Sequence, residues 1–311
     1  MSDWARHEYP SSRKQIEVIA ALVDGLGIRA AARITGVNRG TVAALALKVG
    51  HGCAVLHDGM MVGLRPSRVE LDELWSFVAK KQARVRKDEL AAAAIGDQYT
   101  YVALGASSRA IISYLTGKRD SGNTHAFIAD LRQRVIGLPE ISTDGFLPYR
   151  NAIRAEFGNR IAHGTITKTY SVTHLAVTEA SRRYSPAQVV AVSHDVVSGV
   201  PANISTSYVE RSHLTLRQSS KRFARLGNGF SKRLKNHCAA VSLYVAHYNL
   251  CRVHESLRST PAMALGIADR VWTIAELIDV ALATQPITPI TTAPDRRKRF
   301  RVIVGGKGES N

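Results

Sequence analysis

The chain has 311 residues, of which 45% are hydrophobic and 22% are charged. This length predicts about two globular domains, and the composition excludes a mini-protein or a wholly disordered chain. The 42 basic and 25 acidic residues give a net charge of +17, which favours a polyanionic partner such as nucleic acid, with an anionic membrane surface as the alternative.

The amino-terminal residues and the cysteines indicate the cellular compartment. The first residues lack the basic and apolar regions of a signal peptide, and no run of ~18 uncharged apolar residues is present to span a bilayer. Cys53, Cys238 and Cys251 are widely spaced and include no C-x-x-C pair, so they indicate neither a disulfide framework nor a structural zinc site. We therefore expect a soluble cytoplasmic protein with no membrane partner.

Residues 1–65 have the apolar periodicity of helices. The segment 28–42 resembles a helix-turn-helix, with Gly36 suited to a left-handed turn and Asn38 suited to cap the second helix. In such an element the side chains at the start of the second helix reach base edges in the major groove, here Asn38, Arg39 and Thr41. The alternative is a three-helix packing domain without DNA contacts, since Ala-rich helices joined by a glycine turn are common.

A domain boundary is predicted at residues 64–67, after which β-branched and aromatic runs alternate with helical segments. The expected strands are 69–78, 99–104, 110–115, 140–144 and 161–170. The expected helices are one that Ser121 caps, followed by 149–157, 207–217 and 229–248. Residues 182–206 are rich in Pro, Ser, Val and Gly and predict irregular structure. This order predicts an α/β fold with a mixed sheet flanked by helices over residues 66–275, followed by a basic, disordered tail at 276–311.

Three acidic residues stand at unusual places in this pattern. Asp72 lies within an apolar strand, Asp144 ends a strand and precedes a glycine, and Glu210 lies on a helix. Burying a carboxylate is costly unless it is paired or coordinates a metal ion, and the carboxyl ends of strands are where open α/β sheets bind ligands. For each acid, pairing with an arginine is the alternative to a role in chemistry.

Two further acids flank Asp72. Because side chains alternate along a strand, Glu73 points to the opposite face, and we expect only one member of the Asp72–Glu73 pair to face a metal site. Glu70 shares the face of Asp72, and the interpretation as a charge at the start of the strand is favoured over that as a secondary ligand.

Five short motifs occur in order along the chain. They are D-E-L-W-S-F-V at 72–78, S-T-D-G at 142–145, S-T-S-Y-V-E-R at 205–211, R-F-x-R-L at 222–226 and T-P-A-M at 260–263. In this order and spacing, over about residues 30–275, the chain resembles the DDE transposases of the bacterial insertion sequence one family. The resemblance implies a ribonuclease H-like catalytic core in which Asp72, Asp144 and Glu210 are the catalytic acids and Arg217 helps to hold the end of the element.

The chemistry of these acids agrees with what the resemblance implies. Carboxylates from two strands and one helix can converge on a pair of divalent ions ~3.5 to 4 Å apart, which suits in-line displacement at phosphorus. Oxygen ligands favour Mg²⁺ or Mn²⁺. We therefore expect Asp72, Asp144 and Glu210 to hold two such ions, one activating water or a DNA 3′-hydroxyl and the other stabilising the leaving oxygen.

The basic residues concentrate after Glu210. Residues 211–258 hold ten Lys or Arg and one acid, a net charge of +9, whereas solvated helix faces normally mix the two signs. We expect Arg211, Lys221 and Arg222 of this block to contact DNA phosphates. A solvated helix face is the alternative.

Together these observations predict a transposase that cuts and joins double-stranded DNA at the ends of its element. It would act as a homo-oligomer on DNA, in the cytoplasm of a bacterium and associated with the nucleoid. A non-catalytic DNA-binding regulator derived from such an enzyme is one alternative, although the presence of all three acids argues against it. A nuclease or integrase of the same fold is the other, because its site would look identical.

Overall fold

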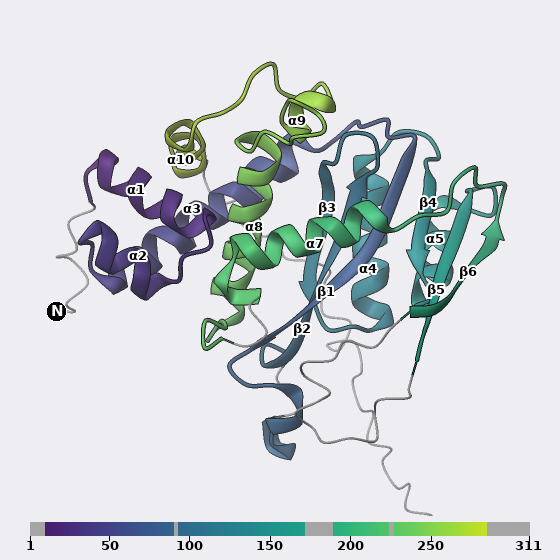
Figure 1. The fold of residues 1–311 in the computed structure, drawn as a ribbon, viewed down its shortest axis with the longest axis horizontal. Coiled ribbons are helices and arrows are strands. Elements are labelled where there is room, and N and C mark those ends of the chain that lie inside the picture. The colour runs from purple at the N-terminus through teal and green to yellow at the C-terminus, as the bar shows by residue number, and fades with distance from the viewer. Residues whose placement is uncertain (1–9, 90–92, 172–188, 224–226, 285–311) are drawn as a thin grey trace, which may run out of the picture.

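The computed structural model describes residues 10–89, 93–171, 189–223 and 227–284 (Figure 1). Its centre is a mixed sheet with the strand order β3-β2-β1-β4-β5-β6. The strands are β1 (Arg68–Val78), β2 (Gly96–Gly105), β3 (Ile111–Gly117), β4 (Glu140–Asp144), β5 (His163–Tyr170) and β6 (Val189–Ser198). β4 runs parallel to β1 and β5, and the other neighbouring pairs are antiparallel. The predicted α/β class with a mixed sheet is therefore confirmed.

The helices of the described residues are α1 (Ser12–Val23), α2 (Ile28–Thr35), α3 (Arg39–Met60), α4 (Ser121–Arg134), α5 (Pro148–Phe157), α7 (Ser207–Ser219), α8 (Leu234–Leu250), α9 (Pro261–Ala264) and α10 (Ile274–Ala283). Short 3₁₀ turns cover Gln82–Arg84, Lys87–Glu89 and Lys221–Phe223. Figure 1 shows α4 and α5 on one face of the sheet and α7 on the other. Within the described residues, no helix combines the length and apolar character that crossing a bilayer requires.

The alternation of side chains along β1 divides the core of the sheet into two layers. Val69 and Leu71 face one way and pack in a cluster with Phe127 of α4. Leu74 faces the other way and packs with Val209 of α7. The same alternation directs the acids of β1 toward different layers.

The three amino-terminal helices contain the turn and cap that the sequence predicts. Gly36 has a φ of +72°, in the left-handed region where a side chain is disfavoured. The Asn38 side chain accepts a hydrogen bond of 2.8 Å from the Gly40 N–H at the start of α3. That these helices form a DNA-reading helix-turn-helix stays a prediction.

The apolar face of α3 packs against helices from the far end of the described chain. Leu45 and Val49 share a cluster with Leu243 of α8 and Leu277 of α10. At Gly50 a Cβ atom would lie 2.2 Å from the Ala239 carbonyl oxygen, so only a glycine permits α3 and α8 to approach this closely. The amino-terminal helices therefore share this core with α8 and α10. The division of the chain into domains at residue 65 stays a prediction.

Three boundaries differ from those predicted. The irregular structure expected at 182–206 is wrong for β6, which pairs antiparallel with β5, while residues 172–188 lie outside the described residues. The tail was predicted to start at residue 276, which lies inside α10. This helix begins with a capping box between Thr273 and Glu276. Residues 285–311 lie outside the described residues. α4 is capped by Asp120, one residue before the predicted Ser121, through a 2.8 Å bond from the Asn123 N–H.

Candidate active site

The predicted acids of the sheet lie where β1 and β4 separate. The two strands pair only from Arg68–Glu70 to Glu140–Ser142, so beyond these residues the sheet opens between them. Asp72 lies on β1 just past the last paired residue, and Asp144 is the last residue of β4. An Asp144 carboxylate oxygen accepts a 2.9 Å hydrogen bond from the Phe146 N–H, which fixes the side chain at the opening.

Asp72, Glu73 and Asp144 form one carboxylate cluster at this opening. Each offers an oxygen, and these oxygens all lie within 4.8 Å of one another. Burial and the neighbouring Asp144 raise the pKa of Glu73 to about 7, and burial also raises the pKa of Asp144. Among the described residues, the buried Oε1 of Glu73 has no hydrogen-bond partner. A group of close carboxylates with an unpartnered buried oxygen fits a divalent cation.

The position of Glu73 corrects one prediction. Asp72 and Glu73 do leave β1 on opposite faces, but the expectation that only one of them can face a metal site is wrong. Because β4 ends at Asp144, no strand separates the two faces at this point, and both side chains reach the same opening.

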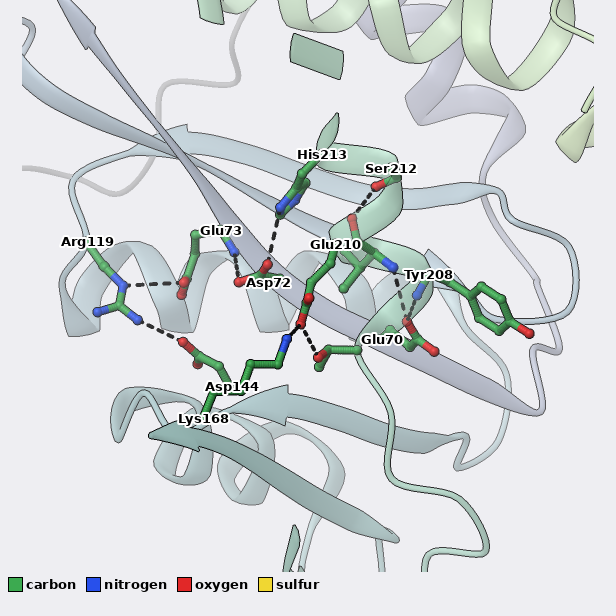
Figure 2. A network of polar contacts seen from close by, with 12 residues as sticks. Glu70, Asp72, Glu73, Arg119, Asp144, Lys168, Tyr208, Glu210, Ser212 and His213 are labelled. Carbon is green, nitrogen blue, oxygen red and sulfur yellow. Dashed lines mark hydrogen bonds and ion pairs between the residues drawn. The ribbon is translucent and has the colours of Figure 1, made fainter. Parts of the chain in front are cut away.

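Arg119, from the connection between β3 and α4, bridges two members of the cluster. Its guanidinium lies 3.3 Å from Glu73 Oε2 and 3.1 Å from Asp144 Oδ2 (Figure 2). It also stacks over the Phe146 ring, with the guanidinium carbon 3.8 Å from the ring centroid. Sequence reasoning missed Arg119, because nothing in its immediate neighbours distinguishes it from an ordinary surface arginine.

Glu210 lies in the first turn of α7, beside this cluster but outside its 4.8 Å grouping. Its carboxylate accepts a 2.7 Å hydrogen bond from Thr206 Oγ1 and is paired with the Lys168 ammonium. Figure 2 shows Lys168 reaching it from β5. The structure thus brings Asp72 and Asp144 together as predicted and adds Glu73 to them. Glu210 lies next to this cluster and is paired with Lys168.

His213 is a further polar residue of the site that sequence reasoning missed. Its Nδ1 lies 3.2 Å from Asp72 Oδ2, and the side chain is almost fully buried. Glu210 and His213 are three residues apart on α7 and so share one face of the helix. The E-x-x-H spacing after the predicted glutamate was the signal that could have found it.

Glu70 anchors the helix that carries Glu210. Its buried carboxylate oxygen accepts hydrogen bonds of 2.8 and 3.0 Å from the Tyr208 and Val209 N–H groups, and Arg68 lies 3.5 Å from the other oxygen. A carboxylate is favoured at this place because the first N–H groups of a helix have no partner inside it. Glu70 therefore fixes α7 against β1.

The residues predicted to contact DNA lie at two places. Asn38, Arg39 and Thr41 lie at the start of α3, and Arg211 and Arg217 lie on α7. Lys221 and Arg222 form the 3₁₀ turn that follows α7. Lys221 is exposed, whereas Arg222 is half-buried and donates a 3.0 Å hydrogen bond to Ser231 Oγ, and burial lowers its pKa.

Comparison with known protein families finds no family model that matches the chain, and comparison with curated proteins finds no matching sequence.

Proposed function

We propose that the chain is a DNA transposase that cuts and joins DNA at the ends of an insertion element, with Asp72, Asp144 and Glu210 as its catalytic acids. One observation carries the proposal. Carboxylates from two separate strands, β1 and β4, meet at the carboxyl end of β4, with the glutamate of α7 beside them. The motifs that resemble the insertion sequence one transposases single out the same three residues.

The arrangement of the sheet supports this function. The order β3-β2-β1-β4-β5, in which β2 runs antiparallel to the mutually parallel strands β3, β1, β4 and β5, is compatible with a ribonuclease H-like core. In this comparison β6 is an additional strand at the edge. The acids lie at the carboxyl end of β4, which is where open α/β sheets bind their ligands.

The donor set fits Mg²⁺ or Mn²⁺. Asp72, Asp144 and Glu73 would hold the ions together with Glu210, since all offer hard carboxylate oxygens. When bound, these ions would lower the pKa of the attacking hydroxyl and neutralise the leaving oxygen.

The chain's own side chains hold and balance this site. Arg119 offsets the mutual repulsion of Glu73 and Asp144, Thr206 orients Glu210, and His213 orients Asp72. Lys168 neutralises Glu210, and in the complex with DNA it exchanges that carboxylate for a phosphate oxygen.

The test uses purified protein, Mg²⁺ and a DNA that carries the flanks of its own coding sequence. We expect cleavage followed by strand joining, which a simple nuclease does not perform. Asp72→Asn, Asp144→Asn and Glu210→Gln each abolish both steps while DNA binding persists. The matched control is Asp279→Asn, an exposed acid of α10. Parental cleavage by Asp144→Asn, or undiminished cleavage in excess chelator, would contradict the proposal.

A further inference from the structure

A cleft of about 970 Å³ separates the amino-terminal helices from the segment that joins α7 to α8. Its lining is one-signed: among the described residues that line it, none is acidic and six are basic. These are Arg29, Arg39, Lys221, Arg222, Lys232 and Arg233. They come from both walls, α2 and α3 on one side and the α7–α8 segment on the other.

The packing of α3 on α8 explains why the cleft exists. The helices touch at Gly50 and Ala239, and their later residues Leu56 and Ala246 also lie together around one small cavity. The helices are therefore packed together from Gly50 onward. The cleft lies beside this contact, at the starts of both helices, and its lining includes the apolar residues Ala43 of α3 and Leu243 of α8.

We infer that this cleft holds the sugar–phosphate backbone of one DNA strand beside the catalytic site, an inference that rests on the proposed function. A lining of one sign attracts a polyanion, and neutralising phosphates with Lys and Arg is the main source of affinity for DNA. The starts of α3 and α8 at the cleft add the positive ends of two helices to this field. The apolar lining suits the faces of sugars and bases.

The cleft joins two groups of residues that the sequence assigned to different tasks. Arg39, expected to read bases, and Lys221, expected to contact phosphates, line the same space. They therefore grip one segment of DNA from opposite sides. Arg222 contributes charge to it while its side chain is held by Ser231.

The length of α7 sets how far the cleft lies from the carboxylate site. Figure 1 shows α7 running from the sheet to α8, and Ser219 at its end lines the cleft while Glu210 is in its first turn. Nine residues of helix span ~14 Å at ~1.5 Å per residue. One strand of DNA can therefore reach from the cleft to the carboxylates.

The experiment measures binding of a fluorescent 30-base-pair random duplex by the full chain at several salt concentrations. The cleft variant is Arg29→Gln with Arg233→Gln, one exposed residue from each wall. Its matched control is Arg154→Gln with Arg160→Gln, two exposed residues in and after α5. We expect the cleft pair to flatten the plot of log affinity against log salt by ~1.8, and the control pair to leave the slope unchanged. Equal slopes for the two pairs would overturn the inference.

A second variant tests the cleft itself rather than its charge. Ala43→Phe fills the apolar lining without altering any charge. We expect weaker DNA binding with the parental salt slope, in a protein whose thermal unfolding midpoint shows that it is folded. Parental affinity for this folded variant would place the strand outside the cleft. Polyglutamate that displaces the duplex as effectively as unlabelled DNA of equal charge would show instead a site for acidic peptides.

Cleavage by the same variants separates this inference from the proposed function. At limiting protein, Arg29→Gln with Arg233→Gln should cut DNA more slowly than the control Arg154→Gln with Arg160→Gln, since the cut strand lies in the cleft. If the parental protein cuts DNA but the cleft pair has the parental salt slope, then the inference about the cleft is wrong and the proposed function stands. If the cleft pair changes the salt slope but the parental protein does not cut DNA, then the proposed function is wrong and the inference that the cleft binds DNA stands.

Discussion

The three acids of β1 lie within four consecutive residues but have different roles. Glu70 accepts two backbone hydrogen bonds from the start of α7, whereas Asp72 and Glu73 face the opening beside Asp144. The difference follows from what each carboxylate meets. The partners of Glu70 are N–H groups that need an acceptor, and those of Glu73 are other carboxylates, whose repulsion Arg119 only partly offsets.

The role of Glu70 predicts a loss of stability on Glu70→Gln. The amide has the size of the carboxylate but lacks its charge, so two charge-assisted hydrogen bonds become weaker. We expect the free energy of unfolding to fall by ~1–2 kcal/mol, measured by urea denaturation. Glu140→Gln is the control, because Glu140 accepts from the Ala202 and Asn203 N–H groups at the surface. Equal losses of stability for the two variants would show that the burial of Glu70 does not increase its contribution to the free energy of unfolding.

The position of Glu73 predicts an effect on metal binding. Because burial and Asp144 raise its pKa to about 7, the carboxylate ionises between pH 6 and pH 8. The affinity for Mn²⁺, measured by calorimetry, should increase across this range. Glu73→Gln should lower the affinity at pH 8 by ~10–100-fold and flatten its pH dependence. If Glu73→Gln binds Mn²⁺ like Glu156→Gln, a control on α5, then Glu73 serves only to hold Arg119.

At the scale of elements, α3 depends on glycines where it crosses its neighbours. A Cβ atom at Gly50 would lie 2.2 Å from the Ala239 oxygen, and one at Gly52 would lie 1.9 Å from the Ala281 oxygen. Near the end of the same helix, Gly59 has open space. α3 can therefore pack this closely on α8 and α10 only because Gly50 and Gly52 have no side chains.

This crossing predicts opposite effects of one substitution at two sites. Gly59→Ala should stabilise the protein by ~0.5–1 kcal/mol, because alanine favours a helix over glycine. Gly50→Ala gains the same helix propensity but forces α3 away from α8, and should destabilise by ~1–3 kcal/mol. Urea denaturation of both variants checks the sign, and stabilisation by Gly50→Ala would contradict the close crossing.

The elements that the sequence predicted are those with a strong one-sided or apolar pattern. β1, β2 and β3 each carry several buried apolar residues close together, so their pattern is visible. β6 was missed because most of its residues are exposed on both faces and its valines do not alternate with polar residues. α10 was taken for tail because its short apolar run precedes the basic residues that end the chain.

The site was predictable in part for a similar reason. Asp72 and Asp144 could be chosen because an acid in an apolar strand or at a strand end is unusual, and Glu210 because the motif S-T-S-Y-V-E-R resembles one of the insertion sequence one transposases. Arg119 and Lys168 could not, because each depends on a connection or strand that returns to the site from elsewhere in the chain. Their chemistry is ordinary, and only the fold gives them their partners.

At the scale of the whole molecule, three buried histidines join separate helices and strands. His57 of α3 lies 3.1 Å from the Ile112 carbonyl oxygen of β3, and His237 of α8 lies 3.2 Å from Ser76 Oγ of β1. His163 of β5 lies 3.1 Å from Thr143 Oγ1 of β4. Burial lowers the pKa of His57 to about 3 and that of His163 and of His237 to about 4. Burial therefore favours the neutral form of all three histidines.

These histidines predict a loss of stability in acid. Their pKa values are lower in the folded state than the usual ~6.5, so their contribution is present above pH 6.5 and is lost as the pH falls. Between pH 6.5 and pH 5 the loss is ~2 kcal/mol for each. The buried Glu73 acts with the opposite sign, so single variants are compared. His57→Gln should flatten the profile of unfolding free energy against pH, and the exposed His194→Gln of β6 should leave it unchanged.

The shared core of α3, α8 and α10 also bears on how the chain is made. The ribosome completes α3 at Met60 and reaches the start of α8 only at Leu234. At ~5–20 residues per second, roughly 10–35 s pass between the end of α3 and the start of α8, and during this time the apolar side of α3 is not covered by α8 or α10. During synthesis this helix is open to chaperones and to other nascent chains, and a transcript cut short within the sheet would yield a product whose first helices never find their core.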